Sequence, residues 1–170
     1  MNVMKKKLVY IFIFSMLCGC GYRFAGEEGI LGGRVKSISV TVFQNKSRWA
    51  DLDVIATNYM IEAIRRSRSV QLTQSNGSYC FSGTIERVKV DTLSRSADGA
   101  SQEKYVEITI STYLTDGHGK KTWQSASMTE REPYFPANNI QDIKAAQKAA
   151  FSSALQRLAD MTMGTLGQGF

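Results

Sequence analysis

Alternation between apolar and polar residues predicts four β-strands along this chain of 170 residues. The most regular run places Val106, Ile108 and Ile110 on one face and Tyr105 and Thr109 on the other. A stretch rich in serine, alanine and glycine between the second and third runs is typical of a mobile hairpin loop. The four runs cover residues 35–43, 79–92, 103–115 and 121–131, the loop covers 94–102, and a short extended piece covers 70–72.

Two further segments repeat their apolar residues every three or four positions, which predicts helices. The first covers residues 52–66, and Asp51 precedes it as a candidate N-cap. The second begins after Asn139, which with Asp142 provides a cap, and is expected to end near Met163. The apolar stripes contain Leu52, Ile55, Ala56, Tyr59 and Ala63 in the first helix, and Ile140, Ile143, Ala150, Phe151, Ala154, Leu155, Leu158 and Met161 in the second.

The order of these elements is strand, helix, three strands, helix. Strands and helices that are apolar on one side only predict an α+β fold, a two-layer sandwich with both helices on one face of a four-stranded mixed sheet. We expect a single domain over residues 35–163 and a frayed end over residues 164–170. The opposite face of the sheet would carry tyrosine, threonine, serine, glutamate and lysine.

The first 20 residues follow a different pattern. Lys5, Lys6 and Lys7 precede an apolar run, residues 8–17, that is too short to span a bilayer, so residues 1–19 are interpreted as a signal peptide. The run ends in Leu17-Cys18-Gly19-Cys20, which resembles a bacterial lipoprotein box, in which the thiol of Cys20 is acylated and the chain is cut before it. The alternative is an ordinary secretory leader with an incidental cysteine.

Residues 20–34 are rich in glycine and are expected to form a lipidated, flexible tether. A cysteine that carries several acyl chains would hold the protein firmly to a membrane, since each buried methylene contributes about 0.8 kcal/mol. Gly21 follows the cysteine where an aspartate would retain the protein at the inner membrane, by resemblance to the sorting rule of enteric bacteria. This favours the periplasmic face of the outer membrane.

The charged residues and the cysteines bear on the possible partners of this protein. The chain has a formal net charge of +6, but the three lysines of the leader supply half of it, so nothing favours a nucleic-acid partner. Cys80 is the one thiol left after cleavage and lipidation; it is expected to be a small strand residue, and an intermolecular disulfide stays open. Arg65, Arg66 and Arg68 form either a solvated helix end or an anion site.

Catalytic and metal-binding patterns are missing from the sequence. The one histidine, His118, lies in a glycine-flanked turn, and there is no Gly-x-Ser-x-Gly elbow or set of closely spaced metal ligands. Glu130 and Glu132 could form a carboxylate pair, although a solvated strand edge explains them as well. We therefore expect no enzyme, no catalytic residues, no metal and no cofactor other than the lipid on Cys20.

Several short motifs follow one another along the chain. They are the start Cys20-Gly21-Tyr22-Arg23-Phe24, the strand end Val40-Thr41-Val42-Phe43, the loop Gln44-Asn45-Lys46-Ser47, the helix start at Asp51-Leu52, and the strand start Tyr79-Cys80-Phe81-Ser82-Gly83-Thr84-Ile85. In this order they resemble the LptE family of lipopolysaccharide-assembly lipoproteins. The resemblance covers essentially the whole mature chain, although Ser47 stands where threonine is frequent and the C-terminus is rich in glycine.

The resemblance implies a lipoprotein on the inner leaflet of the outer membrane that plugs the large β-barrel LptD, helps it assemble, and passes lipopolysaccharide to the cell surface. A barrel lumen is polar, so Tyr105, Thr109 and Tyr113 on the second sheet face are candidate barrel contacts. Lipid phosphates attract exposed cations, although each cation is also explained as a solvated side chain. The candidate lipopolysaccharide contacts are Arg87, Lys89, Arg95, Lys120 and Lys121.

Two other functions stay open at this point. A free-standing, lipid-anchored periplasmic module that binds a small ligand or a glycan would need a concave pocket, whereas a plug needs a well-filled core. A lipid-anchored hydrolase would need further titrating groups that converge near His118.

Overall fold

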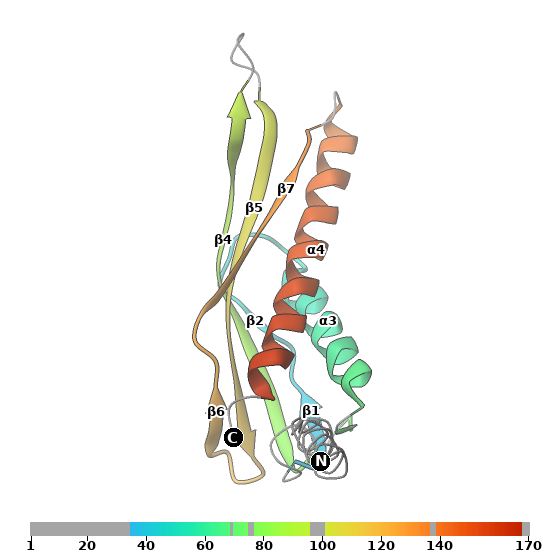
Figure 1. Ribbon diagram of the computed structural model, residues 1–170, viewed down its shortest axis with the longest axis vertical. Helices are drawn as coiled ribbons and strands as arrows, with labels where there is room; N and C mark the ends of the chain where they lie inside the picture. The colour runs from blue at the N-terminus through green and yellow to red at the C-terminus, as the bar shows by residue number, and fades with distance from the viewer. Residues whose placement is uncertain (1–34, 69, 75–76, 96–100, 137–138, 168–170) are drawn as a thin grey trace, which may run out of the picture.

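The computed structural model describes residues 35–167, apart from residues 69, 75–76, 96–100 and 137–138. The expected signal peptide, Cys20 and the tether therefore lie outside the described residues, as do the tip of the hairpin loop and the last three residues. Figure 1 shows the helices beside a long sheet. The strands are β1 (Ser37–Val40), β2 (Gln44–Asn45), β3 (Gln71–Leu72), β4 (Tyr79–Arg95), β5 (Ser101–Asp116), β6 (Lys121–Gln124) and β7 (Met128–Tyr134), and the helices are α3 (Leu52–Ser67) and α4 (Ile140–Leu166).

The α+β class, the two helices and the mixed sheet are confirmed, but the prediction of four strands is wrong because the sheet has seven. Its two longest strands, β4 and β5, are antiparallel neighbours of 17 and 16 residues. Both β4 and β5 are longer than the strands on their other sides, so two short strands pair in succession along the free edge of each. Strands β1 and β2 follow each other along β4, both parallel to it, while β6 and β7 follow each other along β5. The short piece near Leu72 is strand β3, which pairs with β1.

In the break between β6 and β7, a serine side chain accepts hydrogen bonds from strand β5. Ser125 lies in this break, and its Oγ accepts hydrogen bonds from the backbone N–H and the hydroxyl of Thr112, both at 3.0 Å. The two residues are buried, so the serine hydroxyl satisfies groups that water does not reach.

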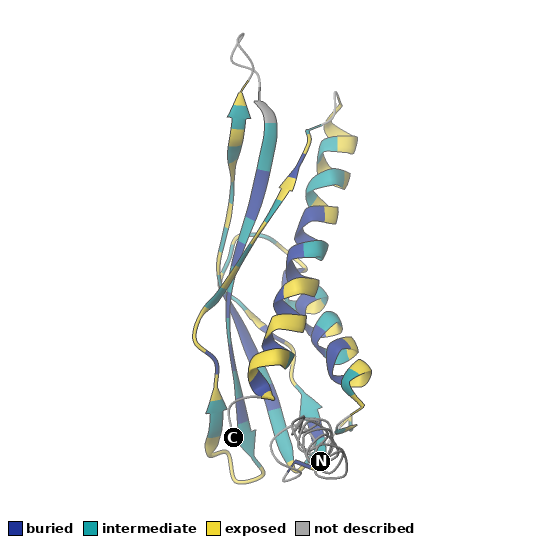
Figure 2. Cartoon of the chain, viewed as in Figure 1, coloured by how far each residue is buried: buried dark blue, intermediate teal, exposed yellow. Residues whose placement is uncertain are grey.

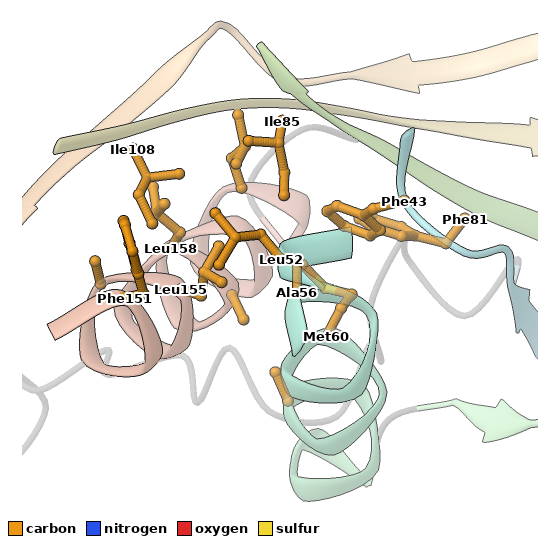
Figure 3. Close-up of a cluster of buried hydrophobic side chains, with 14 of the residues drawn as sticks. Phe43, Leu52, Ala56, Met60, Phe81, Ile85, Ile108, Phe151, Leu155 and Leu158 are labelled. Atoms are coloured by element: carbon orange, nitrogen blue, oxygen red, sulfur yellow. The ribbon is translucent and has the colours of Figure 1, made fainter. Parts of the chain in front are cut away.

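The core lies between the helices and the sheet. Along β5 the residues Val106, Ile108, Ile110 and Leu114 are buried, while the residues between them, apart from the buried Thr112, are only partly buried (Figure 2). In Figure 3 the side chain of Ile108 lies next to Leu158 of α4. Both helices contact the sheet and pack against each other. The other side chains labelled in Figure 3 are Phe43, Leu52, Ala56, Met60, Phe81, Ile85, Phe151 and Leu155.

The helices differ in detail from the sequence prediction. Helix α4 has the predicted cap, because Asn139 Oδ1 accepts the backbone N–H of Asp142 at 2.8 Å, and it continues past Met163 to the buried Leu166. Two members of its predicted apolar stripe are exposed instead, since Ile140 in the first turn is 72% exposed and Met161 is 39% exposed. Asp51 occupies the N-cap position of α3, but its left-handed backbone (φ 64°) leaves the side chain without a capping hydrogen bond.

Candidate partner-binding face

The face of the sheet that points away from the core is here called the outer face. Its residues follow from the strand register, in which Thr109 of β5 lies between Arg87 of β4 and Thr129 of β7. In the next row Glu107 lies between Lys89 and Arg131. The outer face contains Arg87, Lys89 and Asp91 from β4, Tyr105, Glu107, Thr109, Ser111 and Tyr113 from β5, and Thr129 and Arg131 from β7.

Tyr105 lies on this face but is covered by two cations. The guanidinium of Arg131 lies 4.4 Å from the centre of the Tyr105 ring, and the ammonium of Lys89 donates to the Tyr105 hydroxyl at 3.2 Å. Tyr105 is consequently only 7% exposed. Because Lys89 and Arg131 cover the Tyr105 ring, a partner that approaches the outer face would contact these two cations before the tyrosine.

Two ion pairs lie on the outer face, one between β7 and β5 and one within β4. Arg131 donates two hydrogen bonds to Glu107 Oε2, at 2.6 and 3.1 Å, and this contact raises the pKa of the arginine. Lys89 lies 2.9 Å from Asp91, so the hydrogen bond between them raises the pKa of the lysine and lowers that of the aspartate. Surface ion pairs of this kind contribute little to stability, but they hold the side chains in fixed positions.

A further ion pair reaches the β2 edge of the sheet. Glu86 accepts hydrogen bonds from Lys46 and from Ser111, both at 2.7 Å. These two hydrogen bonds lower the pKa of Glu86, that from Lys46 more than that from Ser111. Glu86 therefore links the loop after β2 to strand β5.

The turn between β5 and β6 carries the remaining candidates. The ammonium of Lys121 lies 4.7 Å from the centre of the Tyr113 ring, and Lys120 is exposed beside it. His118 is exposed in the same turn, where Asp116 Oδ1 accepts the backbone N–H groups of His118 and Lys120. Asp116 thus builds the turn, and its position gives no support to a hydrolase centred on His118.

The five candidate lipopolysaccharide contacts do not form one cluster. Arg87 and Lys89 lie together on the outer face, whereas Arg95 ends β4 opposite Ser101 and Lys121 pairs with Thr115. Residues 101 and 115 of β5 are separated by roughly 45 Å at the usual rise per strand residue. A single headgroup therefore meets one end of this set and not the whole of it.

A hollow between α3 and α4 was not expected from the sequence. It has a volume of about 620 Å³, and Trp49, Tyr59 and Phe151 are among its lining residues. The rings of Trp49 and Phe151 lie 5.1 Å apart, and the indole N–H of Trp49 is buried without a described acceptor. Val54 also lines this hollow and is 52% exposed, and in the sequence it is an apolar residue that does not belong to the apolar stripe of α3.

The described part of the chain contains neither a group of metal ligands nor a helix suited to span a membrane. No three His, Cys, Asp or Glu side chains in the described part of the chain lie close enough to hold a metal ion. Neither of the described helices combines the length and the hydropathy that crossing a bilayer requires. The outer face and the hollow between the helices are thus two features of the described residues that a partner or ligand could use.

The sequence model of the LptE family, described as lipopolysaccharide-assembly, matches residues 35–163. The chain belongs to the LptE family. This confirms the resemblance drawn from the sequence motifs. No curated protein matches the chain.

Solved structures share the fold of this LptE-family chain at low sequence identity. A Xanthomonas campestris protein of the DUF330 family has a TM-score of 0.57 and 14% identity, over 78% of this chain and 86% of its own. A putative lipoprotein from Caulobacter crescentus has a TM-score of 0.55 and 12% identity, over 75% of this chain and 89% of its own. A hypothetical protein from Chlamydia trachomatis has a TM-score of 0.51 and 9% identity, over 78% and 96%.

Membership of the LptE family defines the general function. The protein belongs to a non-catalytic family of lipopolysaccharide-assembly lipoproteins that works with the lipopolysaccharide transport machinery. Because the family consists of lipoproteins, its membership also fits association of this protein with a membrane.

Proposed function

We propose that this protein is a lipoprotein of the outer membrane that occupies the lumen of an LptD-type β-barrel. In this role it helps the barrel to assemble and to pass lipopolysaccharide to the cell surface, without catalysing a reaction. The lipid on Cys20 holds it at the periplasmic face, after removal of residues 1–19, and residues 20–34 connect the lipid to the domain. The match to the LptE family over residues 35–163 is the observation that carries the proposal.

The chemistry of the outer face supports a partner with a polar interior. The lumen of a transmembrane barrel is lined by polar side chains. The outer face offers charged and hydroxyl groups in fixed positions, among them the Arg131–Glu107 pair and the Thr109 and Thr129 hydroxyls, whose oxygens lie 2.9 Å apart. Both helices pack on the opposite face of the sheet, so the outer face is available for the barrel. We assign the direct barrel contacts to Thr109 and Tyr113, with Tyr105 beneath Lys89 and Arg131.

Lipopolysaccharide contacts are proposed at two separate places. Arg87 is exposed on the outer face, and Lys120 is exposed in the β5–β6 turn. Lys89 and Lys121 lie beside them but already contact Asp91 and Gln124, respectively. Arg95 lies at the far end of β4, away from both of these places.

Co-purification tests the proposed function. The tagged lipoprotein, extracted from its own membrane in a mild detergent, is expected to carry a large outer-membrane β-barrel, identified by mass spectrometry. A Thr109→Trp variant introduces a bulky side chain on the outer face and is expected to reduce recovery of the barrel. Gln156→Trp, on the exposed side of α4, serves as the control. Recovery of the wild-type protein as a free lipoprotein would contradict the proposal.

The hollow between α3 and α4 favours a second candidate function, the binding of a small ligand or glycan. Its volume of about 620 Å³ lies within the range of ligand sites in proteins, and it has aromatic walls. A Trp123→Phe background leaves Trp49 as the fluorescent reporter. Saturable quenching by a glycan or amphiphile that a Val54→Phe substitution abolishes would support this function, because phenylalanine fills the hollow without adding a second tryptophan. Quenching that persists in the Val54→Phe variant would place the ligand elsewhere.

A further inference from the structure

The C-terminal end of helix α3 carries three arginines close to the point where the described chain begins. Arg65 and Arg66 lie in the last turn of the helix, and Arg68 follows as its C-cap with a left-handed backbone (φ 52°). Strand β3 comes next and pairs with β1, and the Gln71 N–H donates to the Lys36 carbonyl at 3.0 Å. The described chain therefore begins, at residue 35, close to the segment that follows these arginines.

The β5–β6 turn lies at the same end of the sheet. Asp116, at the end of β5, pairs with Tyr79, whose other neighbour is Ile38 of β1. Figure 1 shows the end of α3, the start of β1 and this turn together at one end of the molecule. This end is here called the basic end; its cations are Lys36, Arg65, Arg66, Arg68, Lys120 and Lys121, and all of them are exposed.

Few of these charges are neutralised by carboxylates. Arg66 pairs with Asp160 at 2.5 Å, and Glu62 lines a surface hollow with the three arginines. No carboxylate in the described part of the chain pairs with Arg65 or Arg68. Among the described residues, the six cations of the basic end outnumber the carboxylates that lie with them, Glu62, Asp116 and Asp160, so this end carries a positive field.

The dipole of α3 explains only part of this arrangement. A helix C-terminus favours cations within its last turn, which accounts for Arg65 and Arg66. It does not account for Lys36 on the approach to β1, or for Lys120 in the turn after β5. The common property of the basic end is its position, since it is the end at which the chain from Cys20 enters the domain.

We propose that the basic end docks on the anionic phospholipid headgroups of the leaflet that holds the Cys20 lipid, when the protein is not bound to a barrel. The inference rests on the lipid anchor in the proposed function. The 14 residues 21–34 span at most about 50 Å, so the anchor keeps the domain close to that leaflet, and the described chain begins at the basic end. Each cation near an anionic surface strengthens binding roughly fivefold, and the effect falls with salt.

Vesicle binding tests this inference without the acyl chains. The chain without its leader, with Cys20→Ser, is mixed with vesicles of phosphatidylethanolamine and phosphatidylglycerol, and with vesicles of phosphatidylcholine alone. We expect salt-sensitive binding to the anionic vesicles only. An Arg65→Gln/Arg68→Gln variant should bind them roughly twentyfold more weakly. A Lys144→Gln/Lys148→Gln variant, with the same change of charge on the N-terminal half of α4, should stay within about twofold of the parent.

Several results would overturn the inference. These are equal binding to neutral vesicles, equal losses in the two variants, and binding only to vesicles in which lipopolysaccharide replaces phosphatidylglycerol. Circular dichroism melting of both variants ensures that a loss of binding does not reflect unfolding. Because no barrel is present in the assay, its outcome is independent of the co-purification that tests the proposed function.

Discussion

Replacing Gly83 with alanine is expected to destabilise the domain, because Gly83 lies directly beneath an aromatic ring. It occupies β4 between Phe81 and Ile85, which are both fully buried in the core. A Cβ atom at residue 83 would lie 2.2 Å from Cε2 of Phe43 and 2.3 Å from its Cζ. Ordinary van der Waals contact begins near 3.4 Å, so the ring would have to move by about 1.2 Å.

The surroundings of Phe43 resist such a movement. The ring of Phe81 lies beside it with centroids 6.3 Å apart, and Phe43 is only 3% exposed. Its backbone N–H donates to the Thr57 hydroxyl at 3.0 Å, which ties it to α3. Overpacking in cores costs about 1–3 kcal/mol, and the poor room for relaxation points to the upper half of this range. A loss of about 2–3 kcal/mol corresponds to a melting temperature lower by about 10 °C for a domain of this size.

Urea denaturation, followed by tryptophan fluorescence, measures this loss in the chain without its leader. Gly164→Ala is the matched control, because a Cβ atom there meets nothing within 4 Å. Alanine in the helix should stabilise the protein by about 0.5–1 kcal/mol. A Phe43→Leu substitution should relieve part of the Gly83→Ala loss in the double variant. The reasoning is refuted if Gly83→Ala unfolds at the same urea concentration as the wild type.

Two further predictions concern polar contacts. Ser125→Ala removes the acceptor of the buried Thr112 N–H and should cost about 1–3 kcal/mol in thermal or urea unfolding, whereas Ser127→Ala, at an exposed position, should change stability little. The lowered pKa of Glu86 means that its stabilising effect is present above pH 4.5 and is lost as the pH falls through its folded-state pKa. In the Glu86→Gln variant the melting temperature should therefore fall less steeply below pH 4.5 than in the wild type, and Glu62→Gln serves as the control. Equal slopes in the wild type and the Glu86→Gln variant would contradict the stabilising role of ionised Glu86.

Local patterns predicted the parts of the fold that depend on near neighbours in sequence. The helical period located α3 to within a residue at its C-terminal end, and the Asn139–Asp142 pair identified the start of α4. Strict alternation located β5, since from Val106 to Leu114 each buried residue is followed by one that faces outward. These features follow from side-chain direction in a helix or strand, which sequence spacing determines directly.

Other features depend on contacts between distant residues. The splitting of the last predicted strand at Ser125 follows from the length of β5 relative to its neighbours, which no local pattern records. Tyr105 is buried because Arg131, from β7, lies over its ring. The hollow between the helices needs Trp49 and Phe151 to meet, although about a hundred residues separate them. Alternation therefore predicted that Tyr105, Thr109 and Tyr113 lie on the face opposite the core, but it did not predict that Tyr105 is buried.

Crosslinking from the outer face tests the central claim most directly. A photoreactive amino acid is placed at Thr129, whose side chain lies on the outer face beside Thr109, and cells that make the full lipoprotein are irradiated. The account predicts an adduct with a large outer-membrane β-barrel, identified by mass spectrometry, that does not form without irradiation. No adduct from a folded and abundant protein, or an adduct with a periplasmic protein that is not a barrel, would contradict it.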